Sequence, residues 1–155
     1  MATDAPETFH LRVEAAIEWR PGVRFCGTTA AKLTWWDTHP DETVRVNARI
    51  RRPSAAWVVG DQRELSSALF IPLGEQAWVA TPAFSVLDMT AAGDGNAICE
   101  ALRRGASTLS GMLETLALLP RAKGNGLRRR ILEESRDTPG HPSKGKPTCC
   151  CARVE

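Results

Sequence analysis

The chain has 155 residues, of which 25% are charged and 43% hydrophobic, and its formal net charge is +2. This composition is typical of a globular protein and excludes a chain that is fibrous or disordered throughout. No apolar run approaches the ~18 residues that a membrane span needs, so we expect no transmembrane segment. Acidic residues, Asp4 and Glu7, stand where a signal peptide carries bases, so the sequence predicts a cytoplasmic protein.

The charge is unevenly distributed along the chain. Residues 1–120 contain 11 Lys and Arg against 14 Asp and Glu, whereas residues 121–155 contain 9 against 4. The second part is also rich in glycine, proline and lysine, and such a segment buries too little apolar surface to offset its ordering entropy. We therefore expect a folded domain over residues 1–120 and a flexible basic tail over residues 121–155, with a short helix at 127–135.

Alternation of apolar and polar side chains, which is typical of half-buried strands, recurs along the chain. It is longest over residues 9–19, where every odd position is apolar. Gly93 and Gly95 mark a tight turn at 93–96, which predicts a hairpin. The predicted strands cover residues 9–19, 30–36, 43–51, 57–59, 69–73, 77–80, 84–89 and 97–101.

Two helices interrupt and end this series of strands. Asp61 has the position of an N-cap, with Glu64 as its capping-box partner, so we expect a short helix over 62–68. Leucines spaced three and four apart predict a C-terminal amphipathic helix over 109–119, which Pro120 ends. Strands, a short helix, more strands and a final helix define an α+β fold built on antiparallel β-sheets.

Cysteine usage is consistent with a reducing compartment. Cys26 and Cys99 stand in apolar surroundings and are expected to be buried thiols. The run at Cys149, Cys150 and Cys151 lacks the separated pairs of a zinc site. Palmitoylation, redox crosslinking and the absence of any role stay open for this run.

No catalytic or metal-binding pattern emerges from the residues. The three histidines, His10, His39 and His141, fall on a predicted strand, a turn and the tail, and none has the oriented partners of a catalytic triad. We therefore expect a protein that is not an enzyme and that takes no metal and no cofactor.

Basic residues gather on one predicted sheet face. Arg45, Arg49 and Arg51 point outward from the strand over 43–51, and Trp36 precedes it closely. Such faces can bind single-stranded nucleic acid by stacking and phosphate contact. The other interpretations are a protein contact and an ordinary solvated face. These four residues are our candidate partner-contact residues.

Four segments, in order, resemble the SsgA-like proteins, which are sporulation and cell-division regulators of filamentous actinobacteria. The segments are AKLTW at 31–35, similar to the family's A-R-L-T-Y; Trp57 with REL at 63–65, similar to its Trp and A-R-E-L-L; FIPLG at 70–74, similar to F-R-P-x-G; and GDGNAICEA at 93–101, similar to P-D-G-x-A-L-L-E-A. The likeness spans residues 9–120.

This resemblance implies a Whirly-like fold and a non-enzymatic adaptor of sporulation-associated cell division. Such a protein assists the FtsZ ring, directly or indirectly, in septum placement or wall synthesis, and it is recruited from the cytoplasm to division septa. Its implied partners are cell-division proteins and other family members, and we expect a homo-oligomer. The alternative is a module that binds single-stranded nucleic acid through the basic sheet face, which the sequence makes the less favoured interpretation.

Overall fold

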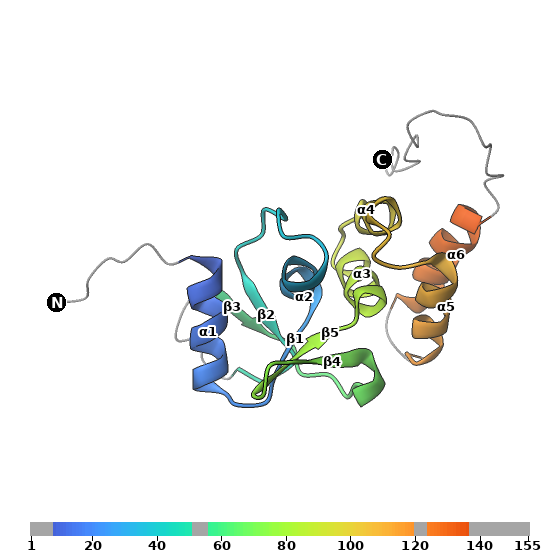
Figure 1. Cartoon of the computed structure of the whole chain (residues 1–155). Coiled ribbons are helices and arrows are strands. Elements are labelled where there is room, and N and C mark those ends of the chain that lie inside the picture. The colour runs from blue at the N-terminus through green and yellow to red at the C-terminus, as the bar shows by residue number, and fades with distance from the viewer. Residues whose placement is uncertain (1–7, 51–55, 120–123, 137–155) are drawn as a thin grey trace. The chain divides into compact units, whose positions relative to one another are not determined.

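A computed structural model of the chain describes residues 8–50, 56–119 and 124–136 (Figure 1). The chain divides into two compact units, Met1–Thr81 and Pro82–Glu155. The described part of the first unit is built around a β-sheet, and that of the second is helical.

The sheet of the first unit is mixed rather than antiparallel. Its strand order is β3-β2-β1-β5-β4. The central strand β1 is parallel to β5 and antiparallel to β2. At the two edges, β3 is parallel to β2, and β4 is antiparallel to β5. The strands are β1 (Val23–Phe25), β2 (Val44–Val46), β3 (Val58–Gly60), β4 (Phe70–Leu73) and β5 (Ala77–Ala80).

Burial along these strands follows the two-residue period of a sheet that has one face in the core. Helix α1 (Phe9–Trp19) contacts β2, and helix α2 (Gly27–Thr34) contacts β2 and β5 (Figure 1). The inward side chains of the central strands are fully or nearly fully buried, because apolar side chains on one face lose contact with water together. They are Val23, Phe25, Val44, Val46, Ala77 and Val79.

The α+β class is confirmed, but the prediction of purely antiparallel sheets is wrong, and nothing in the structure confirms a Whirly-like fold. The predicted strands over 57–59, 69–73 and 77–80 correspond to β3, β4 and β5, and β2 forms the first part of the strand predicted over 43–51. Short strands bounded by Pro and Gly leave little room for another assignment, which explains this success.

The predicted strand over 9–19 is wrong, because these residues form helix α1. The segment also has a helical repeat, which includes an even position: Phe9, Val13 and Ala16 are buried, at the i, i+4 and i+7 spacing of one helix face. Thr8 caps the helix, with its hydroxyl accepting from the Leu11 amide at 3.4 Å.

Three further predicted strands are also helices. Residues 30–36 overlap α2, residues 84–89 lie in α3 (Pro82–Ala91), and residues 97–101 begin α4 (Ala97–Arg104). The run at 84–89 is buried at almost every position and so has no period that separates a strand from a helix, whereas the other two runs are too short to define one. Two of the four segments behind the SsgA-like resemblance, at 31–35 and 93–101, therefore contain helix where strands were expected.

The helix predicted over 62–68 reduces to a 3₁₀ turn, η1 (Ser67–Leu69). Asp61 is not its cap, because the Ser66 hydroxyl accepts from the Ala68 amide at 3.3 Å. Instead the Asp61 amide donates to the Val46 carbonyl at 3.1 Å, which extends the pairing of β3 with β2. The residues after Asp61 thus continue as an irregular segment along the sheet.

The described part of the second unit packs four helices around its own apolar core. Helix α3 contacts α4, α5 (Leu109–Ala117) and α6 (Asn125–Arg136), and α5 contacts α6. The predicted amphipathic helix over 109–119 is confirmed as α5, and Thr108 caps it by accepting from the Gly111 amide at 3.0 Å. Fully buried core residues of this unit include Phe84, Leu87, Met112, Leu116 and Leu132.

Helix α6 confirms the short helix predicted within the tail, and its Leu132 is buried. The rest of that tail, residues 137–155 with Cys149, Cys150 and Cys151, lies outside the described residues. The prediction that Cys26 is a buried thiol is confirmed, whereas the same prediction is wrong for Cys99, which is half-buried and disulfide-bonded.

Candidate interaction surface

One face of the sheet is turned away from the core of the first unit. The outward residues that keep solvent exposure form a set that we name the open face. Across the sheet it consists of Val59, Arg45, Arg24, Trp78 and Pro72, in which Arg45 lies diagonal to Arg24 and not in register with it. Phe70 and Ala80 share this face but are buried, and Asn47, opposite Arg24, is bonded to the backbone of Arg63. Val59 and Trp78 are 43% and 42% exposed, although both are large apolar side chains.

Arg24 and Trp78 form the centre of the open face. They are direct partners in the parallel register of β1 and β5, so their side chains stand side by side. The guanidinium of Arg24 also lies over the ring of Phe70, with Cζ 5.1 Å from the ring centroid. This cation–π contact fixes the direction of a long side chain that would otherwise lose considerable entropy on binding a partner.

Arg45 stands beside Val59 in the parallel register of β2 and β3. Its side chain is 41% exposed, and its Nε lies 3.6 Å from the Asp41 Oδ2. That separation is an ion pair but exceeds a hydrogen bond, so Asp41 holds the guanidinium only loosely. Antiparallel pairing of Phe25 with Val46 makes Arg45 and Arg24 diagonal neighbours across β2 and β1.

The charge of the five strands is entirely positive. Within the described strands, Arg24 and Arg45 are the charged residues, and both belong to the open face. Carboxylates begin only where the strands end, with Asp41 before β2, Asp61 directly after β3 and Glu75 in the turn between β4 and β5. The open face is thus a cationic and apolar surface, and the nearby acidic residues stand at the ends of its strands.

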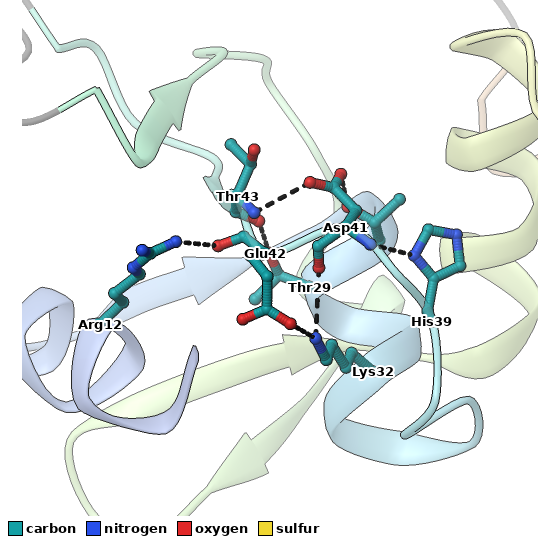
Figure 2. Close-up of polar contacts among 8 residues, drawn as sticks. Arg12, Thr29, Lys32, His39, Asp41, Glu42 and Thr43 are labelled. Carbon is teal, nitrogen blue, oxygen red and sulfur yellow. Dashed lines mark hydrogen bonds and ion pairs between the residues drawn. The ribbon is translucent and has the colours of Figure 1, made fainter. Parts of the chain in front are cut away.

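The turn before β2 is held by a cluster of polar contacts (Figure 2). Asp41 accepts from the Thr28 hydroxyl at 2.7 Å and from the Thr43 amide at 2.9 Å. The Asp41 amide in turn donates to Nδ1 of His39 at 3.1 Å. These bonds tie the loop after α2 to the first residues of α2 itself.

Two further contacts fasten the same turn to the helices. Lys32 forms an ion pair with the Glu42 carboxylate, and Arg12 donates from Nη1 to the Glu42 carbonyl at 3.1 Å (Figure 2). Thr29 joins α2 to β2, since its hydroxyl donates to the Thr43 carbonyl at 3.0 Å and accepts from the Arg45 amide at 2.7 Å. The backbone of Arg45 is therefore bonded through its amide to Thr29 and through its carbonyl to the amide of Cys26.

The acidity of Asp41 reflects this cluster. Partial burial alone would raise its pKa, but the hydrogen bonds from the Thr43 amide and the Thr28 hydroxyl, together with the charge of Arg45, outweigh burial. The pKa of Asp41 is consequently lowered, and the carboxylate stays ionised at neutral pH. We interpret the cluster as structural support for the open face, because its donors and acceptors satisfy one another.

The four predicted contact residues do not form a single set. Arg45 points outward as predicted, between buried Val44 and Val46. Arg49 is exposed but lies beyond the end of β2, and Arg51 lies outside the described residues. Trp36 follows α2 and packs edge-on against His39, with ring centroids 4.7 Å apart, so it belongs to the turn and not to the strand face.

The sequence analysis missed Arg24 and Trp78. Trp78 was inside a correctly predicted strand, and its alternation with buried Ala77 and Val79 could have marked it as outward. Arg24 was missed because β1 has three residues, too few for a recognisable period. Their pairing could not be foreseen, since it joins strands far apart in the chain.

Neither a metal site nor a membrane span is found in the part of the chain that the structure describes. Within residues 8–50, 56–119 and 124–136, no group of three or more His, Cys, Asp or Glu side chains is placed to hold a metal ion. Over the same ranges, no helix combines the length and hydrophobicity needed to cross a bilayer.

Comparison with protein-family models, with curated proteins and with solved structures found no match for this chain. The open face and its supporting turn therefore carry the functional argument by their own chemistry.

Proposed function

We propose that the chain is a non-enzymatic adaptor that binds other proteins through the open face. The observation that carries this proposal is the exposed Trp78 beside Arg24 on one face of the sheet. Trp and Arg are the residue types that most often dominate binding energy at protein interfaces. The cation–π contact of Arg24 and the fixed backbone of Arg45 favour a preorganised surface, which reduces the entropy lost on binding.

The proposed process is sporulation-associated cell division, with assistance to the FtsZ ring in septum placement or wall synthesis. This part of the proposal rests on the SsgA-like resemblance alone. It includes recruitment from the cytoplasm to division septa and self-association of the chain, with cell-division proteins as partners.

A fluorescent fusion of the full chain, expressed in a sporulating hypha, tests this proposal. We expect ladder-like septal foci for the wild type and loss of the foci for Trp78→Ala. The matched control is Trp19→Ala, since Trp19 is also a solvent-exposed tryptophan, 55% exposed, but lies on α1. A diffuse or nucleoid signal for the wild type would overturn the septal role, and unchanged ladders for Trp78→Ala would remove the open face from it.

A second candidate function is binding of single-stranded nucleic acid, because two arginines and a tryptophan on a sheet face could contact phosphates and stack on bases. The affinity of the full chain for a single-stranded oligonucleotide, measured at rising salt concentration, separates the two functions. A nucleic-acid binder loses affinity steeply as salt rises, whereas the adaptor shows no binding at moderate salt.

A further inference from the structure

The open face has a charge pattern that specifies the chemistry of its partner, and this step rests on the proposed adaptor function. In strand order, the two arginines occupy inner positions, with Val59 beyond Arg45 on one side and Trp78 and Pro72 beyond Arg24 on the other. A complementary surface must therefore be acidic in its middle and apolar at its two ends.

The spacing of the two arginines narrows the form of this partner. Diagonal neighbours on adjacent antiparallel strands are about 7–8 Å apart. In an extended peptide, side chains at i and i+2 point to the same side and are separated by about 6.6 Å. Two carboxylates in an acid–x–acid arrangement thus match the spacing of Arg45 and Arg24. Acids at adjacent positions point to opposite sides of an extended peptide, and acids at i and i+4 are too far apart.

The length of the face sets the length of the partner segment. Five strands are separated by four spacings of about 4.8 Å, so the open face is roughly 19 Å wide. About six residues of extended chain cover that distance. Apolar side chains beyond each acid would then reach Val59 at one end and Trp78 at the other.

The guanidinium groups of both arginines are available to bind a carboxylate. A guanidinium that stacks on a ring, as Arg24 does on Phe70, keeps its N–H edge available for a bidentate contact. Arg45 has only the loose ion pair with Asp41 at 3.6 Å, which a closer carboxylate can outcompete. We infer that the open face binds an extended acidic segment of a partner protein, with an acid–x–acid core and an apolar residue beyond each acid.

A display library of random dodecapeptides, selected against the immobilised full chain, tests this inference. We expect recovered peptides to be enriched in the acid–x–acid pattern with flanking Leu, Phe or Trp. Arg24→Gln and Arg45→Gln should each abolish the enrichment. Arg20→Gln is the matched control and should preserve it, since Arg20 is exposed but lies at the end of α1.

A second measurement does not depend on the folding of any protein variant. A recovered peptide is resynthesised with Gln in place of both acids, and its affinity for the wild-type chain should fall at least about tenfold. Trp78 fluorescence, with Trp78→Phe as the blank that isolates its signal, reports whether the peptide reaches the open face.

Several outcomes would overturn the inference. They are recovery of no peptide, recovery of peptides without acidic enrichment, equal binding of the Gln peptide, and displacement of the peptide by an oligothymidylate of similar length. The last result would assign the open face to nucleic acid. Acidic selection without septal foci would refute the septal role alone, and septal foci without acidic selection would refute this inference alone.

Discussion

At the scale of single residues, Asp41 supports the candidate site from outside the open face. Its carboxylate joins the Thr28 hydroxyl, the Thr43 amide and the Arg45 guanidinium. Because the strand that carries Arg45 begins immediately after this turn, the position of the arginine depends on the turn's hydrogen bonds. A half-buried acceptor with two donors is costly to replace, since each donor would lose its partner.

Asp41→Asn is expected to lower the free energy of unfolding by about 1–3 kcal/mol at neutral pH, because a charge-assisted acceptor is lost. The folded-state pKa of Asp41 is lowered from 3.8, so its contribution is present above that pH and disappears as the pH falls through the lowered pKa. The stability difference between the wild type and the variant should therefore begin to shrink as the pH falls below about 3.8, and it should vanish only below the lowered pKa of Asp41.

Urea unfolding between neutral and acidic pH measures this difference. Glu42→Gln is the control, because Glu42 is the adjacent acid, is 51% exposed and takes part in a surface ion pair. Such pairs contribute about 0–1 kcal/mol. An Asp41→Asn variant as stable as the wild type at neutral pH would contradict the structural role of the carboxylate.

At the scale of elements, α1 shows why the pattern of apolar residues could be interpreted in two ways. Apolar side chains occupy every odd position from Phe9 to Trp19. A strand would put all of them on one face, whereas the helix buries Phe9 and leaves Leu11 50% exposed. Both arrangements satisfy local preference, and packing against the sheet decides between them.

Phe9→Ala and Leu11→Ala distinguish the two arrangements. In the helix, Phe9→Ala removes a side chain that is 5% exposed and should cost about 3–5 kcal/mol. Leu11→Ala alters the exposed side and should change stability by no more than about 0.5 kcal/mol. Chemical denaturation of the purified chain provides both values. Equal and large losses for the two variants would indicate that residues 9–19 bury all their odd positions, as in a strand.

The same ambiguity explains how much of the fold was predictable. Strands β4 and β5 were predicted closely because Gly74, Glu75 and Gln76 separate two short apolar segments. Helix α3 was mistaken for a strand because its apolar residues are buried on several sides and leave no polar face to set the period. Strand order was beyond reach, since the parallel pairing of β1 with β5 depends on tertiary contacts and not on adjacent sequence.

The candidate site was predictable in part for the same reason. Arg45 was correctly placed outward, because buried valines flank it in a strand that was recognised. Trp36 was expected beside Arg45 because residues 30–36 were interpreted as a strand. Most of these residues form α2 instead. The aromatic residue that shares the face is Trp78. Its position next to Arg24 follows from the pairing of β1 with β5, which cannot be predicted from the order of residues along the chain.

At the scale of the whole molecule, the chain has two cores with different architecture. The first unit buries Phe25 and Val79 on its sheet, and the second buries Phe84, Met112 and Leu132 among helices. Each core is formed by residues that are local to its own part of the chain. A cavity introduced in one core therefore acts first on the unit that contains it.

Hydrogen exchange on the full chain tests this independence. Phe25→Ala removes a fully buried ring, at a cost of about 3–5 kcal/mol, and should accelerate exchange at the amides of β1, β2 and β5. The amides of α5 should keep their protection. Met112→Ala is the reciprocal variant, since Met112 is fully buried in α5, and it should accelerate exchange in α3 and α5 while sparing the sheet. If either variant raised exchange equally in both units, the chain would unfold as one cooperative body, and the open face would then depend on the helical unit for its rigidity.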